Sequence, residues 1–171
     1  MTVFFEALRW SKAFPELGFK IFVEGVDRLF TYWCATKKPN GREYGIGDGS
    51  TDWQGRVVDE NMASRTVFRR EFGLPDRPPA TSLFFPDAGQ VFFRLDWTPS
   101  ATYVTFDATR WFGAHNHLGC NGITLHAHGH SLLIDSGSLT YHFAHAATIN
   151  PHLLNELAGP YRKSTRVHNT L

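Results

Sequence analysis

The chain has 171 residues, of which 42% are hydrophobic and 15% aromatic, enough apolar side chains for one ordinary domain or two small ones. Its 17 basic and 16 acidic residues are mixed along the sequence and give a formal charge of +1, so no basic stripe indicates nucleic acid or a membrane surface as a partner. No apolar run reaches the roughly 18 residues that span a bilayer, and the first residues lack the features of a signal peptide. The two cysteines, Cys34 and Cys120, form neither a disulfide framework nor a CxxC metal site.

The first part of the chain has the spacing of amphipathic helices. Apolar residues recur every three or four positions from Phe4 to about Trp33, with a break near Pro15. A loop rich in Gly, Asn, Pro and Asp follows over residues 37–53, and the spacing then predicts a helix from Trp53 to Phe72. The run GLPDRPPATS, residues 73–82, ends this helical part.

Beyond residue 80 the apolar residues alternate with polar ones, which is typical of β-strands. The alternation runs through residues 82–97, 101–109 and 122–137, with turn signals about every ten residues. We therefore expect an α+β protein in which a short α-helical segment, residues 1–79, is followed by an antiparallel β-segment, residues 80–171.

All nine histidines lie in this second part. Because residues two apart on a strand point to the same side, His115 and His117 present two imidazoles on one face. The same spacing recurs at His126, His128 and His130. There, the alternation with apolar residues favours a half-exposed strand whose histidines point to solvent.

Two further polar residues stand in unusual settings. Asp135 follows three apolar residues in LLIDSGS, and His168 lies in STRVHNTL. A carboxylate at the end of a buried strand is costly unless it is paired or binds a metal. Two histidines and one aspartate make a three-ligand divalent site, most naturally for zinc with a water in the fourth position. The spacing of His115 and His117 alone also allows two satisfied polar residues at a strand entrance.

Five blocks of the sequence resemble the heparinase II/III-like polysaccharide lyases, which include heparin, heparan and alginate lyases. The blocks are DAGQVFFRLDW, ATYVTFDA, GAHNHLG, GHSLLIDSGSLTY and YRKSTRVHNTL, and they occur in the family's order and approximate spacing over residues 87–171. The resemblance implies an incomplete (α/α) toroid followed by an antiparallel β-sandwich, in a protein several times longer. Residues 1–79 then resemble the end of the toroid, and residues 80–171 the N-terminal part of the sandwich, so the chain looks like a piece of such a protein.

The resemblance also implies a metal site. Carried over position by position, it assigns His117, Asp135 and His168 to a structural site, usually for zinc, that braces the sandwich beneath the active cleft. Relatives often have an acid two residues after the second histidine of the HxH pair, where this chain has Gly119. The expected site therefore lacks a carboxylate that could hydrogen-bond to one of the metal ligands and orient it.

Candidate catalytic and substrate-binding residues follow in the same way. His115 falls where the family places a histidine facing the substrate, and Tyr141 matches a recurrent tyrosine, so both are catalytic candidates. Tyr161 matches another recurrent tyrosine and is a substrate-binding candidate together with Trp111, whose ring can stack on a sugar.

The family implies a carbon–oxygen lyase that cleaves acidic, uronate-containing polysaccharides by β-elimination. A base removes the C5 proton, the uronate carboxylate is neutralised, and an acid protonates the leaving oxygen. In the family, the principal tyrosine and its Asn or His partner come from a part of the toroid that precedes this sequence. We therefore expect the isolated chain to have little or no activity, and the family places such proteins in the periplasm, the cell envelope or the medium.

Two other classes of function stay open at this point. One is a carbohydrate-binding β-sandwich without catalysis, which would stack sugars on the aromatic residues Trp97, Trp111 and Phe112. The other is a metal-dependent hydrolase or cupin-like barrel whose four ligands would be His115, His117, Asp135 and His168. An unsaturated product that absorbs in the ultraviolet would distinguish a lyase from both.

Overall fold

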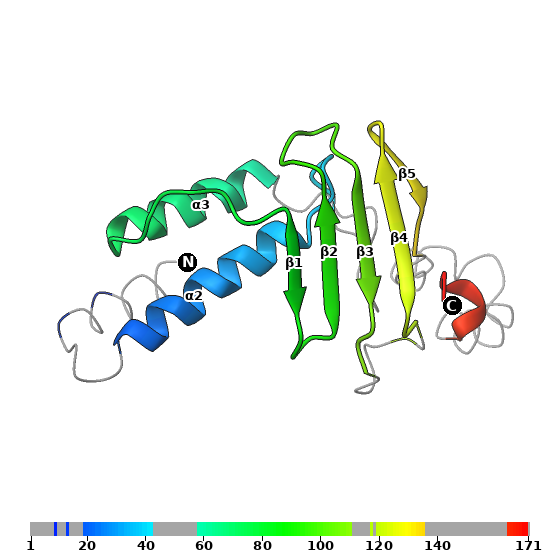
Figure 1. Ribbon diagram of the computed structural model, residues 1–171, viewed down its shortest axis with the longest axis horizontal. Coiled ribbons are helices and arrows are strands. Elements are labelled where there is room, and N and C mark those ends of the chain that lie inside the picture. The colour runs from blue at the N-terminus through cyan, green and yellow to red at the C-terminus, as the bar shows by residue number, and fades with distance from the viewer. Residues whose placement is uncertain are drawn as a thin grey trace, which may run out of the picture. The chain divides into compact units, whose positions relative to one another are not determined.

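The computed structural model describes residues 9, 13, 19–42, 58–110, 117, 119–135 and 164–170. It confirms the predicted α+β class, with helices followed by an antiparallel sheet (Figure 1). Two compact units are distinguished: Met1–Cys34 with Asp59–Pro79, and Ala35–Val58 with Ala80–Leu171. Residues 35–42 therefore group with the sheet, whereas the sequence pattern placed them in the helical segment.

The helical unit contains α2, Phe19–Ala35, up to Cys34 and α3, Val58–Glu71, from Asp59. The two helices lie side by side (Figure 1). Val23, Val26 and Phe30 of α2 recur at helical spacing and pack with Phe68 of α3 in a buried core. The rings of Phe30 and Phe68 lie 5.3 Å apart between centroids. Burial of one such side chain is worth about 1.5–3 kcal/mol, so this contact stabilises the unit. Among the described residues, no helix is long and apolar enough to cross a membrane.

Helix α3 ends at a glycine, as the sequence predicted. The backbone N–H of Gly73 donates to the carbonyl of Arg70, and that of Leu74 donates to the carbonyl of Arg69. Gly73 has a φ of 66°, which a residue with a β-carbon adopts less readily. This pair of bonds is the Schellman arrangement, and it turns Leu74 back onto the core.

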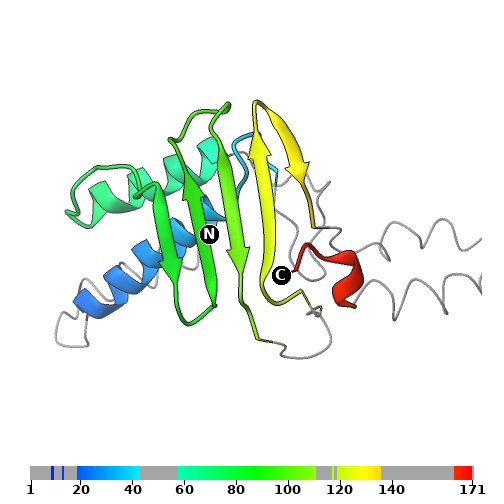
Figure 2. The ribbon, with the colours of Figure 1, turned by 45° about the vertical axis from the view of Figure 1, so that its right-hand side comes forward.

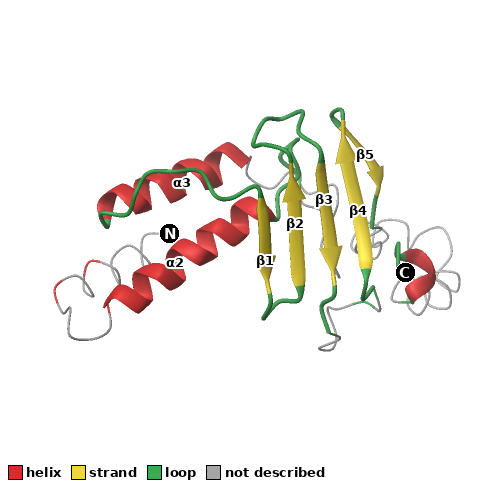
Figure 3. Ribbon diagram, in the orientation of Figure 1, coloured by secondary structure: helices red, strands yellow, loops and turns green. Residues whose placement is uncertain are grey.

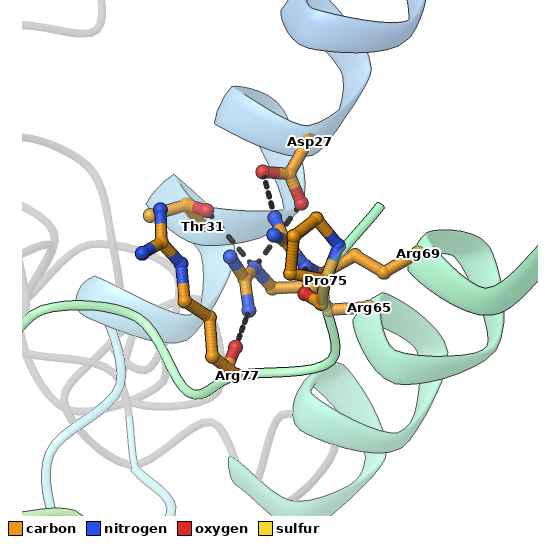
Figure 4. Close-up of polar contacts among 6 residues, drawn as sticks. All are labelled: Asp27, Thr31, Arg65, Arg69, Pro75 and Arg77. Atoms are coloured by element: carbon orange, nitrogen blue, oxygen red, sulfur yellow. Dashed lines mark hydrogen bonds and ion pairs between the residues drawn. The ribbon is translucent and has the colours of Figure 1, made fainter. Parts of the chain in front are cut away.

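A buried polar cluster joins the two helices to the segment that follows α3 (Figure 4). The carboxylate of Asp27 pairs with the guanidinium groups of both Arg65 and Arg69. Arg65 also donates to the carbonyl of Arg77 at 2.7 Å, and Arg69 donates to the carbonyl of Pro75 at 2.6 Å. Burial lowers the pKa of Arg65, and the nearby Asp27 opposes that shift. The cluster therefore fixes the chain after α3 through charge-assisted hydrogen bonds.

The second unit is built on one five-stranded sheet in which each strand pairs antiparallel with the next along the chain (Figures 2 and 3). The strands are β1, Ser82–Phe85; β2, Gln90–Arg94; β3, Tyr103–Asp107; β4, Gly122–Ala127; and β5, His130–Leu133. The turn between β4 and β5 has two central residues, His128 with a φ of 52° and Gly129 with a φ of 78°. Two positive φ values mark a type I′ turn, whose twist suits a tight hairpin.

One face of the sheet, which we call the covered face, is buried although it is largely polar. It comprises Gln90, Phe92, Arg94, Tyr103, Thr105, Thr124 and His126. The expectation that His126 points to solvent is therefore wrong, since this residue is only 1% exposed. His128 and His130, at and after the hairpin turn, are exposed as expected.

Residues 35–38 contact the covered face and supply partners for some of its polar groups. Tyr103 donates its hydroxyl to the carbonyl of Ala35 at 2.7 Å, and Arg94 donates to the carbonyl of Lys37 at 2.6 Å. The Nζ of Lys38 lies 3.4 Å from Oγ of Ser131 on β5. These bonds explain why polar side chains are tolerated on the buried side of the sheet.

The opposite face, the open face, is apolar and partly exposed. Its side chains are Phe84, Val91, Phe93, Val104, Phe106, Ile123, Leu125 and Leu133, placed together by the strand register. Phe84 is 65% exposed and Phe93 is 47% exposed. In a β-sandwich such a face packs against a second sheet; the described residues form one sheet only.

Candidate functional site

Three predicted site residues from distant parts of the chain lie together beside the sheet. His117 precedes β4, Asp135 follows β5, and His168 follows the short 3-10 turn η4, Thr165–Val167. Nδ1 of His168 is 2.6 Å from Oδ2 of Asp135, and the rings of His117 and His168 are 5.2 Å apart between centroids. All three residues are buried. Because a carboxylate can only accept, Nδ1 of His168 is the donor of this hydrogen bond.

The C-terminal segment reaches this position by pairing with the start of β4. The backbone of Thr170 forms an antiparallel bridge with Gly122, and the N–H of Ile123 donates to the carbonyl of Asn169 at 3.0 Å. The N–H of His168 donates to the carbonyl of Thr165 and closes η4. Short-range turns and one strand-like bridge therefore place His168 in the cluster.

Gly119, noted in the sequence because relatives often have an acid there, has a steric role. A β-carbon at this position would lie 3.1 Å from Cγ of His168 and 3.3 Å from Nδ1. The space that a side chain at position 119 would need is thus taken by the imidazole of His168.

Asp107 is a residue that the sequence analysis missed. It ends β3, and its Oδ1 accepts a hydrogen bond from the N–H of Thr109 at 2.8 Å. Burial raises the pKa of the Asp107 carboxyl, and the negative charge of Asp135 raises it further, against the opposing effects of Thr109 and His168. A carboxylate at a strand end was the signal that pointed to Asp135, and it could have pointed to Asp107 as well.

The described part of the chain contains no group of three His, Cys, Asp or Glu side chains already arranged to hold a metal ion. The cluster nevertheless gathers two imidazoles and one carboxylate, which are donors that zinc accepts. Metal binding by His117, Asp135 and His168 stays a prediction. The other four candidates, Trp111, His115, Tyr141 and Tyr161, lie outside the described residues.

Comparison with solved structures identifies the fold. The chain is similar to heparan sulfate lyase HepC from Pedobacter heparinus, with a TM-score of 0.69 and 18% identity over 97% of this chain and 26% of that one. It is similar to a heparinase III gene product, with a TM-score of 0.64 and 18% identity over 88% of this chain and 24% of that one. For a further heparinase III the TM-score is 0.57 and the identity 16%, over 79% and 25% of the two chains.

The chain thus spans about a quarter of the length of the solved structures that it resembles. No curated protein shows significant sequence similarity to it. The model of one protein family, described as heparinase II/III-like, C-terminal, matches residues 77–171, which is more than half of the chain and includes the whole sheet and the His117, Asp135 and His168 cluster. The chain therefore belongs to the heparinase II/III-like C-terminal family.

Proposed function

We propose that this chain is part of a polysaccharide lyase that cleaves uronate-containing glycans by β-elimination, in the periplasm, in the cell envelope or outside the cell. The observation that carries the proposal is the family match over residues 77–171. The fold shared with a protein described as a heparan sulfate lyase supports it. The acidic polysaccharide is the proposed partner because the proposed reaction acts on it. The balanced charge of the chain favours neither nucleic acid nor a membrane.

The proposal includes a structural zinc ion held by His117, Asp135 and His168. The support is chemical: nitrogen and carboxylate donors from three distant segments are buried together, where an unpaired carboxylate would be costly. Two ligand atoms on one tetrahedral zinc ion are about 3.3 Å apart, as ligand distances of about 2.0–2.2 Å require. The 2.6 Å contact between His168 and Asp135 would therefore lengthen if both bind the ion. Such an ion would stabilise the junction of β4, β5 and the C-terminal segment.

The proposed chemistry assigns roles to side chains outside the described residues. His115 would neutralise the uronate carboxylate or remove the C5 proton, because an imidazole titrates near neutral pH. Tyr141 is the candidate acid for the leaving oxygen, and Trp111 and Tyr161 are candidate contacts for the sugar rings. A lyase needs base, acid and neutraliser held together, so we propose that residues beyond this chain complete the site.

The lyase proposal is tested by incubation with heparan sulfate, alginate and related uronate polymers, while the absorbance of the unsaturated uronate product is followed. We expect little or no turnover by the 171-residue chain, and turnover by the full product of its gene wherever that product is longer. In the active protein, His115→Ala should reduce the rate by several orders of magnitude. Saturated products would identify a hydrolase, and binding without any product would identify a carbohydrate-binding module.

The zinc proposal is tested by metal analysis of the purified protein together with thermal unfolding. Wild type should contain one zinc ion per chain, and removal of that ion by a chelator should lower the melting temperature. His117→Ala should abolish the zinc content, whereas His128→Asn, at the exposed hairpin turn, should preserve it. Absence of zinc combined with unchanged stability of His117→Ala would rule out the metal site.

A further inference from the structure

We propose that Asn169 is a positioning residue of the His117, Asp135 and His168 cluster. Asn169 connects the C-terminal segment to two parts of the sheet unit. Its carbonyl accepts from the N–H of Ile123 on β4 at 3.0 Å, and its side-chain Nδ2 donates to the carbonyl of Ile134 at 2.6 Å. Among the hydrogen bonds described above, this is the one that joins the C-terminal segment to Ile134, the residue before Asp135.

Two hydrogen bonds join the C-terminal segment to the residues just after β5, and they involve consecutive residues in each of these two segments. Asn169 bonds Ile134, while His168, its predecessor, bonds Asp135, the residue after Ile134. The backbone of His168 is extended, with φ of −108° and ψ of 147°, so the side chains of residues 168 and 169 leave the backbone in different directions. The Asn169 bond therefore acts on the same pair of segments as the His168 bond and helps to keep His168 within reach of Asp135.

A tight turn holds Asn169 in place. The N–H of Thr170 donates to the carbonyl of His168 at 2.8 Å, which closes a three-residue turn centred on Asn169. With its backbone held by this turn and by β4, the Asn169 amide has few ways to reach Ile134 other than the one observed. Loss of the amide would leave the bond between His168 and Asp135 as the one side-chain hydrogen bond described above between the two segments, so the His168 ring would be less firmly oriented.

The consequence for the cluster is a defined tautomer. In the metal-free chain the Asp135 carboxylate only accepts, so His168 bonded to it carries a proton on Nδ1; a zinc ion bound at that atom would replace the proton. Residues that orient a ligating histidine usually affect metal affinity by about 10- to 100-fold. The inference deepens the proposed zinc site and rests on it for the affinity measurement, but the tautomer of His168 in the metal-free protein tests it independently.

The test compares Asn169→Ala with Asn61→Ala as a matched control. Asn61 on α3 makes the same kind of bond, from Nδ2 to the carbonyl of Trp33 at 3.3 Å, but belongs to the helical unit. Zinc affinity is measured by competition with a chromophoric chelator, and the His168 tautomer by long-range proton–nitrogen correlation in the metal-free chain. We expect Asn169→Ala to weaken zinc binding by about 10- to 100-fold and to mix the two ring tautomers. Asn61→Ala should leave both properties as in wild type.

The outcomes separate the inference from the function on which it builds. If wild type binds no zinc, the metal site of the proposed function is wrong. The role of Asn169 is then tested by the His168 tautomer alone. The inference is overturned if Asn169→Ala keeps the Nδ1–H tautomer and the wild-type zinc affinity, or if wild type lacks that tautomer. If Asn169→Ala does not fold, Asn169→Asp is used for the tautomer measurement, because it keeps the size of the side chain and replaces the amide donor by an acceptor.

Discussion

The imidazole of His168 lies directly over Gly119, so closely that a β-carbon at position 119 would come within 3.1 Å of Cγ of the ring. The same ring donates a hydrogen bond from Nδ1 to Asp135. His168 is therefore positioned by a glycine that leaves space for its ring and by a carboxylate that accepts a hydrogen bond from it.

Gly119→Ala should destabilise the sheet unit by about 1–2 kcal/mol, because added volume in a packed site forces neighbours out of place. The ring of His168 would have to move by a few tenths of an ångström and would weaken its bond to Asp135. Urea unfolding measures the change. Gly25→Ala on α2 is the control, since nothing lies within 4 Å of its added β-carbon; it should stabilise the protein by about 0.5–1 kcal/mol. Equal stability of Gly119→Ala and wild type would contradict the steric role.

Stability should fall with acidification because of His126. Burial lowers the pKa of His126 below its ordinary value of 6.5, and Lys38 and His130 lower it further. The folded state thus binds this proton less readily than the unfolded state. The free energy of unfolding should decrease as pH falls below about 6.5, until the folded-state imidazole is itself protonated.

The measurement for this prediction is urea unfolding at a series of pH values between 7 and 5. His126→Gln, which does not titrate there, should flatten the pH dependence. His128→Asn removes an exposed imidazole from the turn of the same hairpin and should leave the dependence in place. An identical slope in wild type and His126→Gln would show that other groups cause it.

Asp27→Ala should destabilise the helical unit by about 3–5 kcal/mol, because it leaves two buried guanidinium groups without their shared carboxylate. Asp76→Ala provides the comparison. The side chains of the Arg70–Asp76 pair are 70% and 42% exposed, and such pairs contribute about 0–1 kcal/mol. Chemical denaturation in urea, which does not screen charges, gives both values. Similar losses in the two variants would contradict the structural role of the buried cluster.

Thr105 and Thr124 should behave as a coupled pair. Their hydroxyls are 2.6 Å apart on the covered face and both residues are buried. Either Thr→Val change alone leaves one buried hydroxyl without this partner and should destabilise the protein by about 1–3 kcal/mol, whereas the double change should be less harmful than the sum. A double-mutant cycle measured by thermal unfolding tests this, and additive losses would show that the two hydroxyls do not interact.

The sequence was informative about local structure, because helix and strand periods are local properties. The three- and four-residue spacing around Phe30 and Phe68, the glycine that ends α3, and the alternation from residue 82 onward all predicted the observed element types. The predicted start of α3 at Trp53 lies outside the described residues, and the described helix runs from Val58 to Glu71. The site residues His117, Asp135 and His168 could be named from their sequence blocks, and the structure places them together, with metal binding still to be tested.

What the sequence alone could not decide was which side of the sheet is buried. Alternation separates the two faces of a strand, but burial depends on what packs against each face. His126 is buried on the side where Ala35, Lys37 and Lys38 bond to the sheet and where Ser131 bonds its Nδ1, while Phe84 and Phe93 remain exposed on the other. The roles of Gly119 and Asn169 likewise depend on distances to residues far along the chain. The periodicity of apolar residues depends on residues close together in the chain and can be recognised in the sequence. The contacts of Gly119 and Asn169, and those that residues 35–38 make on the side of His126, form only when the tertiary structure brings distant segments together.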